Sequence, residues 1–268
     1  MRRTDLAVEI VEKRELEGVL TEEIRVGDIR ISKVTVEKSG EKLLKKPSGR
    51  YYSLHCDCTS DKNAVSDSIR ECLSELLEKL PDDAPIVVAG LGNINITPDS
   101  LGVITAEKIP ATAHLVEQHS RLSEIMRPVF VFSLGVMAKT GVESAEHLEV
   151  IVKRLRPTAV IVIDSLACRD AGSLASTIQL TDTGISLGSG VGNNRKEISA
   201  RQLGVPVVAI GVPTVIDADN IKSSFEPLMI TPRSIDAIIK TFSDAISHGI
   251  NVFLNPKLSE EEINALLF

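Results

Sequence analysis

Hydrophobic and polar residues alternate over the first 60 positions of the chain, whereas later apolar residues come in continuous runs. Alternation at residues 23–26 and 29–36 is typical of half-buried antiparallel strands, and a glycine turn separates the two stretches. Residues 51–58 continue this pattern. The pattern therefore predicts a β-rich N-terminal extension over residues 1–60.

A different pattern begins at residue 61, where apolar positions three or four apart predict a helix over residues 61–80. Short runs rich in β-branched residues follow at 86–89, 129–132, 159–163 and 207–210. Continuous runs of this kind suit strands that are buried on both faces of a parallel sheet. Helical segments separate them, and Thr231 and Pro232 predict the capped start of another helix.

This alternation predicts an α/β fold with a mostly parallel, twisted sheet flanked by helices. We expect a doubly wound core over residues 61–268. Together with the N-terminal antiparallel strands it would form a single domain over residues 1–268.

The residues that follow the apolar runs are the candidates for chemistry, because ligands of open α/β sheets bind beyond the carboxyl ends of the strands. Asn93 and Asp99 follow the first run, and Asp164 directly follows the third. Two carboxylates that share a cleft resist joint ionisation, so one proton is held between them. Such a pair can activate water with one member and protonate a leaving amine with the other.

Each aspartate also has a purely structural interpretation. Thr97 and Pro98 could cap and begin a helix, so that Asp99 would only complement the helix dipole. Asp164 could simply accept hydrogen bonds from neighbouring loop amides. The sequence pattern alone leaves both interpretations open.

A glycine-rich segment over residues 181–193 lies between the third and fourth runs. It lacks the lysine of a P-loop and does not match the dinucleotide-binding G-x-G-x-x-G pattern. Asp182, Thr183 and Gly184 spell the catalytic tripeptide of pepsin-like proteases, but those are all-β proteins that need two such tripeptides. We interpret the segment as a turn-rich loop that either binds substrate or is purely structural.

The charge and the amino-acid composition of this 268-residue chain exclude several classes of function. The net charge of −7 disfavours a protein that wraps nucleic acid, and an aromatic content of 3% disfavours a base-stacking platform. No apolar stretch approaches the ~20 residues that span a bilayer, and the N-terminus has no signal core. The cysteines and histidines lack the spacing of a metal site. We therefore expect a cytoplasmic protein without a metal, a cofactor, or nucleic-acid or membrane partners.

Several motifs occur in a fixed order along nearly the whole chain. They are R-T-D-L-A-V-E at 3–9, G-L-G-N at 90–93, T-P-D-S-L-G at 97–102, I-D-S-L-A at 163–167, D-T-G-I at 182–185, G-S-G-V-G-N at 188–193 and I-G-V-P-T-V at 210–215. In these motifs the chain resembles the germination protease family of endospore-forming bacteria. The members of this family are atypical aspartic endopeptidases.

The resemblance implies a phosphorylase/hydrolase-like α/β fold, shared with hydrogenase-maturation proteases. It implies hydrolysis of small acid-soluble spore proteins in the spore core during germination, with Asp99 and Asp164 as the catalytic carboxylates. The residues expected to contact the substrate are Asn93, Asp182, Thr183, Gly190 and Asn193. The family also implies a zymogen and a homotetramer.

The chain departs from the family pattern in two places. The first motif starts at Arg3, so we expect a propeptide to be absent, already removed or unused. Residues 219–227 stand where family members have a longer segment.

Two other functions remain open from the sequence. One is a metal-dependent processing protease of the hydrogenase-maturation type, in which Asp99 and Asp164 would bind the metal. The other is a binding protein that has kept the scaffold without catalysis.

Overall fold

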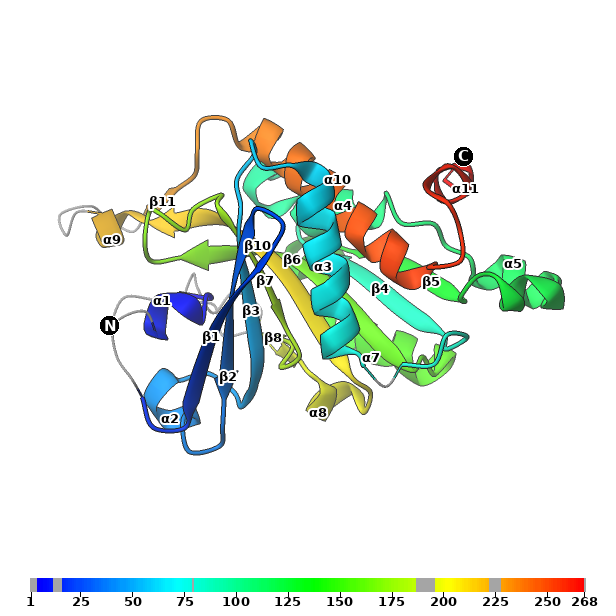
Figure 1. Cartoon of the computed structure of the whole chain (residues 1–268), viewed down its shortest axis with the longest axis horizontal. Coiled ribbons are helices and arrows are strands. Elements are labelled where there is room, and N and C mark those ends of the chain that lie inside the picture. Colours follow the sequence, from blue (N-terminus) through cyan, green and yellow to red (C-terminus); the bar gives the residue numbers. More distant parts are fainter. Residues whose placement is uncertain (1–3, 12–15, 79, 187–195, 222–227, 268) are drawn as a thin grey trace.

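The computed structural model describes residues 4–11, 16–78, 80–186, 196–221 and 228–267, and a nine-stranded sheet runs through them (Figure 1). In spatial order its strands are β1 (Val19–Val26), β2 (Ile29–Val36), β3 (Gly49–His55), β7 (Thr177–Thr181), β10 (Val207–Asp217), β6 (Ala159–Cys168), β4 (Ile86–Leu91) and β5 (Val129–Leu134), with β11 (Met229–Ile230) paired to β10. A separate two-stranded sheet joins β8 (Ile185–Ser186) and β9 (Glu197–Ile198).

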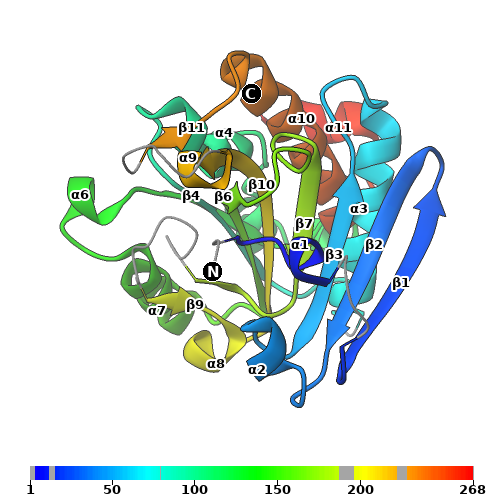
Figure 2. The ribbon, with the colours of Figure 1, turned by 90° about the vertical axis from the view of Figure 1, so that its left-hand side faces the viewer.

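Strands β10, β6, β4 and β5 run parallel to one another and form the core. Helices α3 (Lys62–Leu76), α4 (Leu101–Ala106) and α10 (Ile235–Leu254) cover one face, where Ile86 and Val88 of β4 are buried. Helices α7 (Ser144–Leu155) and α8 (Ala200–Leu203) cover the other face, where Val87 and Ala89 are buried. Figure 2 shows α3 and α10 on the opposite side of the sheet from α7. The predicted α/β fold with helices on both faces is confirmed.

The remaining helices are short and connect the larger elements. They are α1 (Val8–Val11), α2 (Glu41–Leu44), η1 (Thr97–Asp99), α5 (Ala113–Gln118), η2 (Ser120–Glu124), α6 (Met137–Thr140), α9 (Ala218–Ile221) and α11 (Glu260–Ala265). None of the described helices combines the length and the apolar character that crossing a membrane requires.

The N-terminal strands β1, β2 and β3 pair antiparallel, as their alternating pattern predicts. Strand β7 joins them to the core, because it pairs antiparallel with β3 on one side and with β10 on the other. The apolar runs did not indicate β7, since its buried residues include Thr177, Gln179 and Thr181. Antiparallel pairing therefore reaches further into the sheet than the N-terminal extension.

Strands β6 and β10 are longer than the apolar runs predict. The prediction that Asp164 follows the end of a strand was wrong, because β6 continues to Cys168 and pairs with β10 along that length. On its other side, the pairing of β6 with β4 ends at Ile163, opposite Gly90. Asp164 is therefore the first residue of β6 beyond its ladder with β4, so it still lies at the carboxyl edge of the parallel strands.

The pH dependence of stability is expected to include a contribution from His55 at the end of β3. Its Nε2 lies 2.8 Å from Ser32 Oγ, and burial, followed by the charge of Arg30, lowers the pKa of the imidazole. Below an unfolded-state pKa of about 6.5, the unfolded chain takes up a proton that the folded chain resists, so stability falls. The free energy of unfolding of His55→Gln should therefore fall less than that of the wild type as the pH drops below about 6.5.

Denaturant titrations at several pH values test this prediction. The control is His114→Gln, which removes an exposed histidine from α5. Parallel pH profiles for the wild type and His55→Gln would contradict the assignment.

Candidate active site

Asp99 lies in a turn that folds back onto the end of β4. The backbone N–H of Asn93 donates to both the carbonyl oxygen and the Oδ2 of Asp99, each at 2.9 Å. Gly92 has a φ of +116°, and a Cβ atom there would lie 1.9 Å from the carbonyl oxygen of Asp99. Only glycine allows this backbone angle and this close approach. The turn therefore holds the Asp99 carboxylate at the carboxyl end of β4.

Helix α4 brings this turn next to Asp164. A Cβ atom on Gly102, the second residue of α4, would lie 2.2 Å from the carbonyl oxygen of Ile163 and 2.5 Å from that of Leu91. The helix thus packs directly on the backbones of β4 and β6. Asp99 precedes Gly102 by one helical turn, and Asp164 follows Ile163 in β6. The packing explains why two residues far apart in the sequence reach the same place.

Both aspartates line one pocket of about 570 Å³, and Asn93 lines it with them. Asp164 is only 8% exposed, whereas Asp99 is partly exposed. The remaining wall is mixed, with apolar residues such as Leu91, Ile96, Val136 and Met229 and the residues Ser165, Thr214 and Thr231. A pocket of this size has room for several side chains of a polypeptide.

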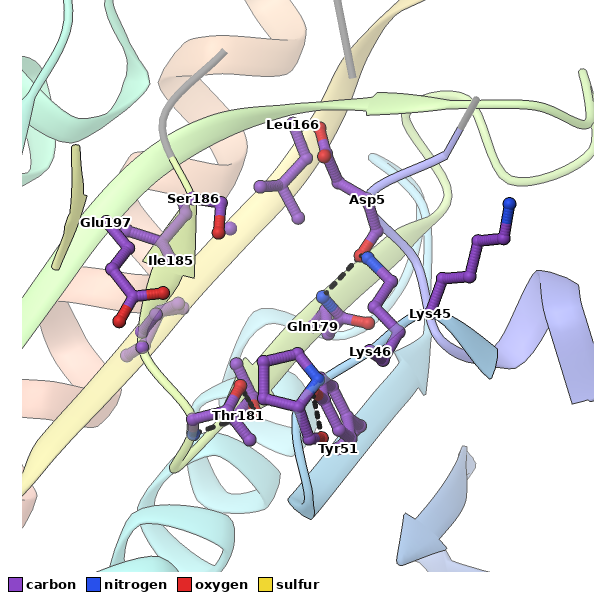
Figure 3. A pocket seen from close by; sticks show the side chains of 16 residues that line it. Asp5, Lys45, Lys46, Tyr51, Leu166, Gln179, Thr181, Ile185, Ser186 and Glu197 are labelled. Carbon is purple, nitrogen blue, oxygen red and sulfur yellow. Dashed lines mark hydrogen bonds between the residues drawn. The ribbon is translucent and has the colours of Figure 1, made fainter. Parts of the chain in front are cut away.

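A second pocket of about 150 Å³ adjoins the first. Figure 3 shows the residues that line this second pocket. The two pockets share the lining residues Asp5, Leu166, Ile185 and Ser186, and we refer to the two adjoining pockets together as the groove. Thr183 also lines the second pocket, and its hydroxyl lies 2.9 Å from that of Thr181.

The N-terminal segment is bound along this second pocket. Lys46 Nζ donates to the carbonyl oxygen of Asp5 at 2.9 Å, and the side-chain amide of Gln179 donates to the same oxygen at 3.1 Å (Figure 3). Burial lowers the pKa of Lys46, although the charges of Asp5 and Glu9 oppose this effect. The sequence patterns assigned no role to Lys46 or Gln179, although Gln179 stands in the family-like string T-I-Q at 177–179.

The other predicted substrate-binding residues differ in their placement. Asp182 lies outside these two pockets, where it accepts hydrogen bonds from the backbone N–H of Arg50 at 2.7 Å and from its Nε at 2.8 Å. These hydrogen bonds link β3, which contains Arg50, to the residue that follows the end of β7. Gly190 and Asn193 lie outside the described residues. Within the described ranges, no three or more His, Cys, Asp or Glu side chains gather closely enough to hold a metal ion.

Comparison with known proteins identifies the family. The family model of the germination protease matches residues 2–226. The chain belongs to the germination protease family. The germination protease of Clostridium perfringens is 35% identical over 320 residues, which cover 99% of this chain and 98% of the relative. That of Caldanaerobacter subterraneus is 37% identical over 317 residues, with the same coverage of each chain.

Family membership makes this chain a peptidase. The alignment of 320 residues exceeds the 268 residues of the chain, so the Clostridium relative has segments that this chain lacks. Among solved structures, a NiFe hydrogenase maturation protease from Thermococcus kodakarensis is similar, with a TM-score of 0.41 and 19% identity over 68% of this chain and 98% of that chain.

Proposed function

We propose that this chain is an endopeptidase of spore germination that hydrolyses small acid-soluble spore proteins in the spore core. In this proposal Asp99 and Asp164 activate the attacking water, and no cofactor takes part. The main support for this proposal is that both aspartates line the same pocket, at the carboxyl edge of the parallel strands. Membership of the germination protease family supports the choice of substrate.

The two aspartates would divide the proton transfers between them. One carboxylate accepts a proton from water as the water oxygen attacks the carbonyl carbon of the scissile peptide bond. The other, protonated carboxyl group gives its proton to the leaving nitrogen as the C–N bond breaks. The dyad again holds one proton at the end of the cycle, now on the other member. A shared proton of this kind is what two neighbouring carboxylates favour.

The groove offers space for an extended polypeptide on one side of the dyad. A substrate chain would pass from the larger pocket across Leu166 and Ser186 into the second pocket, where Thr183 contributes a hydroxyl group. Asn93 would contact the substrate next to the dyad. Asp182, Gly190 and Asn193 remain predicted substrate-binding residues, and the zymogen and the homotetramer remain predictions from the family.

Incubation with a purified small acid-soluble spore protein tests the proposal. An unrelated protein of similar size serves as the control substrate, and each reaction is run with and without a metal chelator. We expect fragments of the spore protein only, at a rate that the chelator does not change. Loss of activity on chelation would favour the metal-dependent alternative. Tight binding without cleavage at any pH between about 5 and 8, where a coupled dyad or a histidine titrates, would favour the binding-protein alternative.

A further inference from the structure

Strand β10 contains a bulge beside the candidate active site. Its residues pair in register with β6 up to Pro213, opposite Leu166, and the register then shifts so that Val215 faces Ala167. Thr214 is therefore the extra residue of the bulge. A β-bulge leaves one residue out of the ladder and redirects its side chain, and bulges occur often next to active sites.

The redirected side chain of Thr214 reaches the turn that carries Asp99. Thr214 is fully buried, and its Oγ1 donates a hydrogen bond of 2.6 Å to the carbonyl oxygen of Pro98. That oxygen belongs to the peptide group that joins Pro98 to Asp99. The carbonyl oxygen of Thr214 itself accepts a 2.8 Å hydrogen bond from the hydroxyl of Thr231. The bulge is thus held on both sides.

The hydrogen bond from Thr214 to Pro98 is one link between the two halves of the dyad, beside the packing of α4 on β4 and β6. The backbone hydrogen bonds of Asp99 itself join neighbouring residues, because its N–H donates to the carbonyl oxygen of Ile96 at 2.7 Å and its carbonyl oxygen accepts from the N–H of Asn93 at 2.9 Å. Thr214 instead ties the turn to β10, and β10 pairs with the strand that carries Asp164, with Gly211 directly opposite it.

We propose that Thr214 is a positioning residue for the dyad, and that its hydroxyl group fixes Asp99 at the working distance from Asp164. This inference rests on the proposed function of the two aspartates. Small errors in the placement of catalytic groups have large effects, since a misplacement of about 1 Å can cost roughly 100-fold in rate. The hydroxyl group, rather than the volume of the side chain, is what the proposal requires.

Two substitutions separate the hydroxyl group from the side-chain volume. Thr214→Val keeps the shape and removes the donor, whereas Thr214→Ser keeps the donor and removes the methyl group. We expect Thr214→Val to lower kcat roughly 10- to 100-fold, because the dyad loses its geometry. KM should change by no more than about twofold, because the groove walls remain in place. Thr214→Ser should retain most of the wild-type kcat.

A matched control measures the cost of losing a buried hydroxyl elsewhere. Thr112 is fully buried, and its Oγ1 donates to the carbonyl oxygen of Arg127 and accepts from the N–H of Val129 at 3.0 Å. Thr112 lies beside Val129, the first residue of β5, and so at the opposite end of the parallel strands from the pocket. Thr112→Val should lower the melting temperature and leave kcat unchanged.

The outcomes distinguish this inference from the proposed function. A wild-type kcat in Thr214→Val, or an equal loss in Thr214→Val and Thr214→Ser, would overturn the positioning role. An equal loss of kcat in Thr112→Val would also overturn it, because the effect would then be one of general stability. Asp99→Asn is assayed beside them. Full activity in Asp99→Asn would instead overturn the dyad itself.

Discussion

The Asp164→Asn variant is expected to hydrolyse a small acid-soluble spore protein roughly 10²- to 10⁴-fold more slowly than the wild type. Asparagine has nearly the same shape as aspartate, so the packing around this 8% exposed side chain is retained. An amide, however, can neither accept a proton from water nor deliver one to a leaving amine. Asp99→Asn should lose activity to a similar degree, because the two carboxylates act as one unit.

The control for these variants is Asp28→Asn. Asp28 is an exposed residue in the turn between β1 and β2, away from the residues that line the groove. Its substitution also removes one negative charge and should leave kcat unchanged. Melting temperatures of all three variants show whether each is folded. A folded Asp164→Asn variant that keeps more than about a tenth of the wild-type rate would contradict its proposed role.

The Gly102→Ala variant is expected to lose both stability and activity. A methyl group at this position meets the carbonyl oxygen of Ile163 at 2.2 Å and the backbone nitrogen of Leu91 at 2.6 Å. These atoms belong to the sheet ladder, so helix α4 must move away from the strands. Overpacking of this kind costs about 1–3 kcal/mol. Because only Ser100 separates Asp99 from α4, the same movement displaces Asp99 from Asp164 and lowers kcat.

Gly172→Ala is the matched control, because a Cβ atom there has no neighbour within 4 Å. It should change the free energy of unfolding by less than about 0.5 kcal/mol. Urea titrations and kcat measured on the same samples provide the comparison. Equal stability and activity in Gly102→Ala and the wild type would contradict the close packing of α4 on the sheet.

The sequence predicted the strands whose apolar residues follow a simple pattern, either alternating or continuous. Continuous apolar runs predicted β4, β6 and β10, because strands buried on both faces have little room for polar residues. A similar run predicted β5, although this edge strand is only partly buried. Strand β7 was missed, since its polar residues are buried in an antiparallel ladder. The predicted start of a helix at Thr231 was wrong. Helix α10 begins at Ile235, and the hydroxyl of Thr231 instead donates a hydrogen bond to the carbonyl oxygen of Thr214.

The candidate site was predictable only in part. The rule that ligands bind beyond strand ends pointed to Asn93, Asp99 and Asp164, and the structure places all three on one pocket. The contact between Thr214 and Pro98 joins residues 116 positions apart and depends on a bulge in β10. A bulge shifts the register by one residue without an obvious sequence signal, so this contact required the structure.

The most direct test of the dyad is the intact mass spectrum of a small acid-soluble spore protein after incubation with this chain. The wild type should produce pairs of fragments whose masses add up to the substrate plus one water molecule, as hydrolysis of an internal peptide bond requires. Folded Asp99→Asn and Asp164→Asn variants should leave the substrate intact over the same period. An intact substrate with the wild type, or the same fragments at the same rate with either variant, would contradict the proposed two-aspartate endopeptidase.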